Sequence, residues 1–172
     1  IKRGWKCFGN DPDKAYIDYG IKKFKLPIKF EQAENMELTK KSLDLIIIMG
    51  SLEHCYDPNK VMKKCSTAAK SNCVLVLEAR GNPQSQSKNY FNHNHHRYFS
   101  ENSLELIMIK YGFEPIFSTS YPITGPTRKG GIYCVGIKKG KKINLKKLIS
   151  SGKREGVNSV LYKYKFFNEM YK

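Results

Sequence analysis

Glu53 and His54 are adjacent residues whose types suit proton transfer. The imidazole of histidine titrates near neutral pH and can accept a proton from a reacting hydroxyl group. The pair follows the apolar run 43–49 and comes shortly before Asp57-Pro58, a combination typical of a helix start. Ligands of parallel α/β sheets bind beyond the carboxyl ends of the strands, so this order predicts an active-site rim just after residue 49.

A second polar segment extends from Ala79 to Tyr98 and is rich in Asn and His. It is too long for an ordinary connection, so a substrate loop or lid is predicted. His95, His96 and Arg97 lie near its end, where they would face an anionic acceptor such as a sugar nucleotide, because arginine binds phosphate in a bidentate fork. The spacing of His93, His95 and His96 also suits metal ligands, and a plain polar loop is the alternative.

The elements around these residues alternate between strand and helix. The run 43–49 is too short to span a membrane and too rich in β-branched residues to favour a helix, so it predicts a strand buried on both faces. Further strands are expected at 5–9, 27–31, 74–78, 113–120 and 131–137, and helices at 12–23, 58–70, 100–111 and, with interruptions, 145–171. The pattern predicts an α/β fold with a mostly parallel sheet and an antiparallel last pair of strands.

Length and composition bound the class of protein. With 172 residues and 40% hydrophobic content, the chain can build one sizeable core. Neither a membrane span of roughly 20 apolar residues nor a signal peptide is recognisable, so a cytoplasmic protein is expected. The five cysteines are scattered and odd in number, which predicts buried reduced thiols and not a disulfide framework or a zinc site.

The net charge of +16 allows two interpretations. Clustered lysine and arginine are the electrostatic signature of phosphate binding, so nucleic acid is one possible partner. The lysines are spread along the whole chain, however, and lysine that only covers solvated faces is the alternative.

Five short segments, taken together in their order, resemble the class I S-adenosylmethionine-dependent methyltransferases. They are Gly9-Asn10-Asp11-Pro12, Ala33-Glu34-Asn35-Met36, the run 43–46 leading to Leu52-Glu53-His54, His96-Arg97-Tyr98-Phe99-Ser100, and Tyr111-Gly112-Phe113. The chain looks most similar to the small-molecule branch, which includes ubiquinone-biosynthesis O-methyltransferases and surface-sugar methyltransferases. The resemblance covers positions 3 to 138 and implies a Rossmann-like, doubly wound sheet with S-adenosylmethionine as cofactor. Residues 1–140 would form this domain and 141–172 a helical extension.

One feature of that family is missing. Its members carry a first strand that ends in a GxGxG loop, which cradles the methionine part of the cofactor, and this chain begins after the corresponding place. The missing strand is the central one of the family sheet, so a gap is expected between the strands at 5–9 and 43–49. We interpret the chain as the carboxyl-terminal portion of a longer protein, with a degenerate or binding-only relative as the alternative.

The resemblance also assigns residues to the cofactor. Asp11 would accept hydrogen bonds from the ribose hydroxyls, with Pro12 lining the pocket, while Ala33 and Glu34 fall where the family wraps the adenine. Met49 would lie against the methionine or sulfonium region, where a thioether fits an apolar wall. The structural alternatives are a helix cap for Asp11, a surface position for Glu34 and a core position for Met49.

On the acceptor side, His54 is the expected base for O-methylation, with Glu53 beside it, and loop orientation is the alternative role of His54. Some relatives hold a divalent ion with a Glu-x-x-Glu-His pattern, but Gly50 stands where the first acid would be, so no metal is expected. The predicted function is methyl transfer to a small molecule or saccharide. An RNA methyltransferase, a non-catalytic RNA-binding relative and a scaffold that has lost cofactor binding are the alternatives, and the oligomeric state is left open.

Overall fold

The computed structural model describes residues 3–81, 95–119 and 131–139. The chain divides into two compact units, Ile1–Leu38 and Thr39–Lys172. Two sequence-based expectations concern residues outside the described ranges: the helix at 145–171 and the extension 141–172. Most of the predicted loop 79–98 also lies outside them.

The amino-terminal unit consists of β1 (Gly9–Asp11), α1 (Lys14–Phe24) and β2 (Ile28–Phe30). The two strands pair in parallel, with Gly9 opposite Ile28, and α1 forms the crossover between them. The predicted strand 5–9 is therefore displaced, because backbone pairing with β2 begins only at Gly9. Helix α1 begins later than predicted, since the carboxylate of Asp13 accepts the backbone N–H groups of Ala15 and Tyr16 and thereby caps it.

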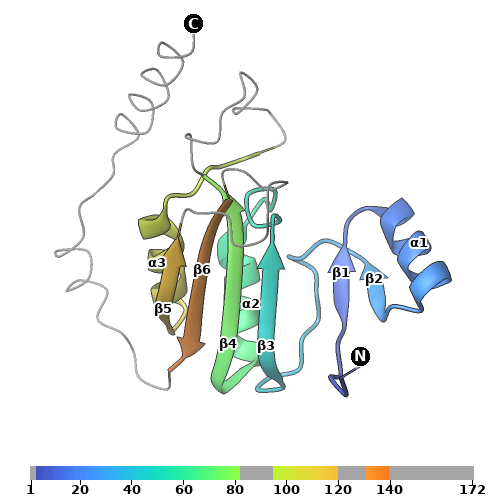
Figure 1. Ribbon diagram of the computed structural model, residues 1–172, viewed down its shortest axis with the longest axis horizontal. Helices are drawn as coiled ribbons and strands as arrows, with labels where there is room; N and C mark the ends of the chain where they lie inside the picture. The colour runs from blue at the N-terminus through green and yellow to red at the C-terminus, as the bar shows by residue number, and fades with distance from the viewer. Residues whose placement is uncertain (1–2, 82–94, 120–130, 140–172) are drawn as a thin grey trace, which may run out of the picture. The chain divides into compact units, whose positions relative to one another are not determined.

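The second unit contains β3 (Leu43–Met49), α2 (Pro58–Ala68), β4 (Ala69–Arg80), α3 (Glu101–Lys110), β5 (Phe113–Thr119) and β6 (Gly131–Lys138). Its sheet has the strand order β3-β4-β6-β5, visible in Figure 1. β3 and β4 are parallel, whereas β6 is antiparallel to both of its neighbours. The predicted α/β fold with a mixed, Rossmann-like sheet is confirmed, and the one reversed strand is inserted between β4 and β5.

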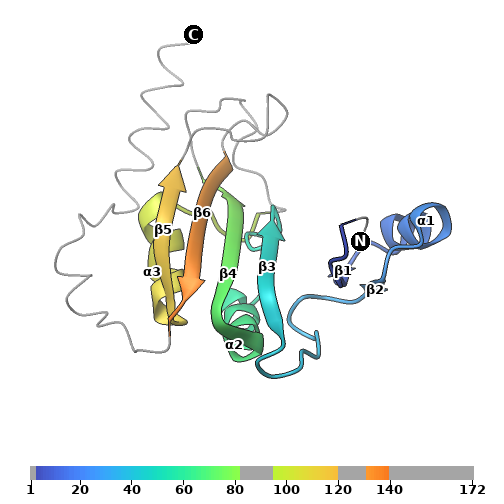
Figure 2. The ribbon, with the colours of Figure 1, turned by 60° about the horizontal axis from the view of Figure 1, so that its bottom comes forward.

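Helices α2 and α3 cover the same face of this sheet (Figure 1), and Figure 2 shows the arrangement from below. Asp57 caps α2 with Pro58 in its first turn, and Ser100 caps α3 through a reciprocal capping box with Ser103. The fully buried side chains between helices and sheet include Leu52, Met62, Leu75, Leu77, Leu104 and Phe113. The hydrophobic core of this unit therefore supports the carboxyl ends of β3 and β4, after which the candidate site residues follow.

β3 departs from expectation in its burial. Ile46 is 8% exposed, but Ile47 is 59% exposed, so the prediction that this strand is buried on both faces is wrong. β3 is an edge strand in the described sheet, and the described helices of its unit cover one face only. Among the described residues, β1 and β2 form a two-stranded sheet of their own, and β3 belongs to the four-stranded sheet. The expected gap between the strands of the two sheets stays a prediction.

Two global expectations can be compared with the described residues. No helix within residues 3–81, 95–119 and 131–139 is both long and apolar enough to cross a membrane. Cys55, Cys65, Cys73 and Cys134 are buried thiols outside any disulfide, as predicted, whereas Cys7 is exposed. Burial raises the pKa of the Cys65 and Cys134 thiols to about 12, which keeps both protonated and inert.

Candidate active site

The chain turns sharply at the carboxyl end of β3. Gly50 adopts a positive φ of 58°, and its N–H donates to the Glu78 carbonyl of β4 at 2.9 Å. Leu52 is fully buried, and the His54 N–H donates to the Ser51 carbonyl at 3.0 Å. This turn holds residues 51–56, hereafter the strand-end loop, against the end of the sheet, where the sequence predicted the active-site rim.

Glu53 is the buried acid of this loop, with only 1% of its surface exposed. Its Oε1 accepts the Arg80 backbone N–H at 3.1 Å, so the carboxylate bridges the ends of β3 and β4. Its Oε2 is buried and has no hydrogen-bond partner among the described residues. A buried carboxylate oxygen without a donor is costly, and such atoms are commonly reserved for a ligand or an ion.

A second segment, residues 95–99, is fastened to the strand-end loop. The His96 N–H donates to the Glu53 carbonyl at 3.0 Å, and the His96 ring stacks on Tyr56 with centroids 5.0 Å apart. The Phe99 N–H donates to the Arg80 carbonyl at 3.0 Å. These contacts bring the end of the predicted substrate loop beside residues that lie some forty positions earlier in the chain.

Arg97 makes the strongest of these connections. Its guanidinium donates to the carbonyl oxygens of Leu52 at 3.3 Å, of Tyr56 at 3.1 Å, and of Cys55. Arg97 was expected to bind an anionic acceptor, but the hydrogen bonds described for it all go to the backbone of the strand-end loop. The geometry therefore favours a positioning role, in which Arg97 holds the loop that carries Glu53 and His54.

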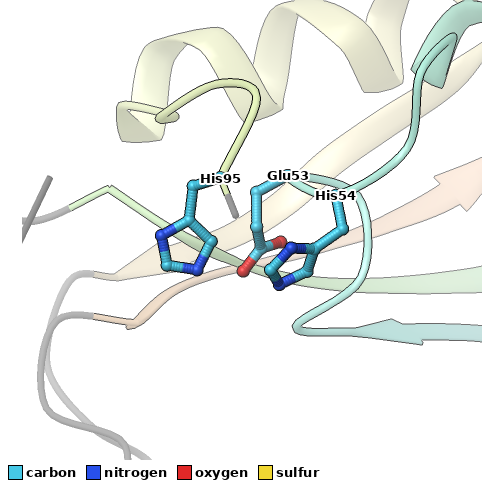
Figure 3. A group of neighbouring side chains, drawn as sticks. All are labelled: Glu53, His54 and His95. Atoms are coloured by element: carbon cyan, nitrogen blue, oxygen red, sulfur yellow. The ribbon is translucent and has the colours of Figure 1, made fainter. Parts of the chain in front are cut away.

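Together these contacts assemble Glu53, His54 and His95 into one cluster (Figure 3). One ligand-type atom of each side chain lies within 4.8 Å of those of the other two, and the two histidine rings are 4.7 Å apart. His95 Nδ1 lies 3.3 Å from the Tyr98 hydroxyl. Burial lowers the pKa of His95, and the positive charges of His54 and Arg80 lower it further. His95 was expected near the acceptor, but its pairing with Glu53 was not foreseen.

Asp11 ends β1 in the amino-terminal unit and is exposed. Its Oδ1 accepts the Asp13 N–H at 2.8 Å and stabilises the turn, while Asp13 itself caps α1. The interpretation of Asp11 as the helix cap is therefore wrong. No hydrogen bond of Oδ2 is found within the described ranges, so the carboxylate fits recognition of the cofactor's ribose hydroxyls. Pro12 follows in the same exposed turn.

Ala33 and Glu34 lie in the turn after β2, at the same edge of the two-stranded sheet as Asp11, because the Glu31 N–H donates to the Asp11 carbonyl. Ala33 is half-buried, whereas Glu34 is only 8% exposed, so the alternative of a plain surface acid is wrong. Met49 is the half-buried last residue of β3, in the other unit. The cofactor roles of these three residues stay predictions.

The sequence profile of a methyltransferase domain family matches residues 2–117. Among solved structures, an S-adenosylmethionine-dependent methyltransferase from Archaeoglobus fulgidus is 16% identical with a TM-score of 0.66, over 80% of this chain and 78% of that one. A possible histamine N-methyltransferase from Thermotoga maritima is 19% identical with a TM-score of 0.61, over 77% and 72% of the two chains.

A third similar structure is the 1,6-didemethyltoxoflavin-N1-methyltransferase of Burkholderia thailandensis with bound S-adenosylhomocysteine, which is 13% identical with a TM-score of 0.60, over 80% of this chain and 63% of that one. No curated protein sequence matches the chain. The expected cofactor, S-adenosylmethionine, is confirmed at the level of the family. The chain belongs to the methyltransferase domain family and has the fold of the S-adenosylmethionine-dependent enzymes.

Proposed function

We propose that this chain supports methyl transfer from S-adenosylmethionine to a hydroxyl group of a small molecule or saccharide. The observation that carries the proposal is the buried Glu53 carboxylate beside His54 and His95, at the carboxyl end of β3. A hydroxyl acceptor has to lose its proton during methyl transfer, and an imidazole next to a fixed negative charge can accept that proton.

On the cofactor side, the proposal assigns five residues to three parts of S-adenosylmethionine. Asp11 binds the ribose hydroxyls, Pro12, Ala33 and Glu34 line the adenosine, and the thioether of Met49 faces the sulfur. When bound, the cofactor supplies a methyl group on a positively charged sulfur. The exposed Asp11 carboxylate, which does not cap α1, supports this assignment.

On the acceptor side, His54 accepts the hydroxyl proton as the acceptor oxygen takes the methyl group. With the cofactor bound, its carbon–sulfur bond would break, and the products would be a methyl ether, S-adenosylhomocysteine and a protonated His54. The Glu53 carboxylate stabilises that imidazolium by its charge. Arg97 and the His96 backbone hold the strand-end loop, so the base is presented in a fixed position.

The test is a His54→Gln variant of the protein as its gene encodes it, including any residues upstream of Ile1. Transfer of labelled methyl groups to a panel of phenols, catechols and nucleotide sugars is followed, and cofactor affinity is measured by calorimetry. Loss of a positioned base lowers turnover by roughly a hundredfold or more, with unchanged cofactor affinity.

Asp44→Asn is the matched control, because Asp44 lies at the opposite end of β3 and pairs with Lys70 on the surface. Its turnover should equal that of the wild type. Equal turnover in His54→Gln would remove the base role. The net charge of +16 makes RNA the second candidate acceptor, and label that enters RNA but none of the small acceptors would favour it.

A further inference from the structure

The cluster of Glu53, His54 and His95 has the composition of a transition-metal site. Two imidazoles and one carboxylate are a ligand set that zinc, cobalt and related divalent ions accept, and three protein ligands leave coordination positions open for water or substrate oxygen. The sequence alone did not indicate it, because Gly50 occupies the place of a local third ligand. His95 supplies that ligand from a distant part of the chain.

We propose that Glu53, His54 and His95 bind one divalent transition-metal ion of the zinc or cobalt type. The first argument is the unsatisfied Oε2 of Glu53, which is buried and has no hydrogen-bond donor in the part of the chain that the structure describes. Its companion oxygen already accepts the Arg80 N–H, so the carboxylate is oriented before any ion arrives. A cation on Oε2 would offset the cost of burying that atom.

The second argument is geometric. The ligand atoms lie within 4.8 Å of one another, whereas ligands about 2.1 Å from one tetrahedral ion lie about 3.4 Å apart. Contraction by up to about 1.4 Å is thus required. The histidine side chains can supply it, because His54 is exposed and His95 half-buried, while Glu53 stays fixed. Figure 3 shows the three side chains gathered beyond the end of β3.

The third argument is that the ligand-bearing segments are already joined. The His96 N–H bonds the Glu53 carbonyl, and the Arg97 guanidinium bonds the carbonyl groups of Leu52 and Tyr56. The backbones beside all three ligands are thus held together without a metal. The ordering cost that an ion would otherwise meet is small, which favours binding to the folded protein.

Metal binding at this cluster does not depend on the proposed function. The effect of the metal on the acceptor hydroxyl group does rest on the proposed methyl transfer. The two roles of His54 belong to two states of the protein: His54 is the base in the metal-free state, and it would be a ligand when an ion is bound. The bound ion would also lower the pKa of a hydroxyl group bound in an open position, whose proton then passes to water.

The test measures binding and not turnover. Cobalt(II) is titrated into the full-length protein carrying Cys7→Ser, because Cys7 is exposed and thiolates are themselves metal ligands. Visible absorption reports cobalt coordination, and competition with zinc confirms the site. We expect one ion per chain in the parent protein and at least roughly tenfold weaker binding in His95→Ala and in Glu53→Gln.

Glu53→Gln retains an oxygen for the Arg80 N–H, so it removes the charge with little change of shape. Asp44→Asn is the matched control, because Asp44 is a surface carboxylate at the opposite end of β3 from the cluster, and its cobalt affinity should equal that of the parent. Far-ultraviolet circular dichroism verifies that each variant is folded. Absence of saturable binding in the parent, or unchanged affinity in both His95→Ala and Glu53→Gln, would overturn the proposal. Either result leaves the methyl-transfer proposal to be judged by its own assay.

Discussion

At the scale of single residues, the proposed cofactor site and the proposed acceptor site each use a carboxylate, and the two carboxylates lie in opposite environments. Glu53 is buried and held through one oxygen, so it contributes a fixed negative charge. Asp11 is exposed and uses one oxygen to stabilise the turn that precedes α1. The exposed carboxylate suits reversible binding of hydroxyl groups, whereas the buried one suits stabilisation of a cation beside it.

Asp11 and Asp13 allow cofactor binding to be separated from helix capping. Asp11→Ala in the full-length protein should weaken S-adenosylmethionine binding by about 1.5–3 kcal/mol, the worth of charge-assisted hydrogen bonds to the ribose. Asp13→Ala should lower the free energy of unfolding by about 0.5–2 kcal/mol, because α1 loses its cap, with cofactor affinity unchanged. Calorimetry and thermal unfolding measure the two effects. If Asp11→Ala bound the cofactor like the wild type, the ribose role would be withdrawn.

At the scale of elements, the site is made by contact between the strand-end loop and the segment 95–99. Gly81 follows β4 and passes directly under Phe99, whose N–H bonds the Arg80 carbonyl. A methyl group on Gly81 would overlap the Phe99 carbonyl oxygen and lie 2.6 Å from its carbonyl carbon. This close backbone approach explains why glycine is required at the end of β4.

Gly81→Ala should therefore separate the segment 95–99 from β4 and disturb the cluster at His95. We expect a loss of unfolding free energy of roughly 1–3 kcal/mol, typical of overpacking, measured by chemical denaturation. Gly9→Ala is the control, because its added methyl group would lie 3.5 Å from Ile28 Cγ2, an ordinary contact distance. Equal stability of Gly81→Ala and the wild type would show that the two segments do not press against each other here.

At the scale of the whole molecule, most of the net charge of +16 comes from residues outside 3–81, 95–119 and 131–139, and within these ranges the lysines are spread over several elements. Several lysines pair with surface acids, among them Lys14 with Asp18 and Lys70 with Asp44. Pairs this exposed contribute little to stability, but they reduce the charge available to a polyanion. Within the described residues, this distribution is typical of a solvated surface.

The corresponding prediction is weak, non-specific RNA binding. Fluorescence anisotropy with a labelled oligonucleotide should show an affinity that falls by orders of magnitude between about 50 and 200 mM salt, because binding depends on counterion release. A scrambled oligonucleotide serves as the control and should bind equally. Tight, sequence-dependent binding that persists at the higher salt concentration would contradict the small-acceptor proposal and support an RNA substrate.

The sequence by itself determined the class of fold and the ends of most elements in the second unit. The run 43–49 matches β3 at both ends, and Asp57-Pro58 and Ser100 mark the helix starts correctly, because capping and β-branched runs are local properties. In the first unit, the starts of β1, α1 and β2 were misplaced by four, two and one residues, because the pairing of β1 with β2 and the Asp13 cap decided them.

Only the tertiary structure decided how the candidate site is assembled. His95 lies beside Glu53 and His54, which come about forty positions earlier in the chain. Arg97 donates hydrogen bonds to the backbone of the strand-end loop, one of them to Cys55, which lies 42 positions earlier. Spacing along a chain carries no information about such contacts, because they depend on where the fold returns the backbone. The exposure of Ile47 was likewise set by the position of β3 at the edge of the described sheet, and Glu53 is held at the end of β4 by the Arg80 N–H.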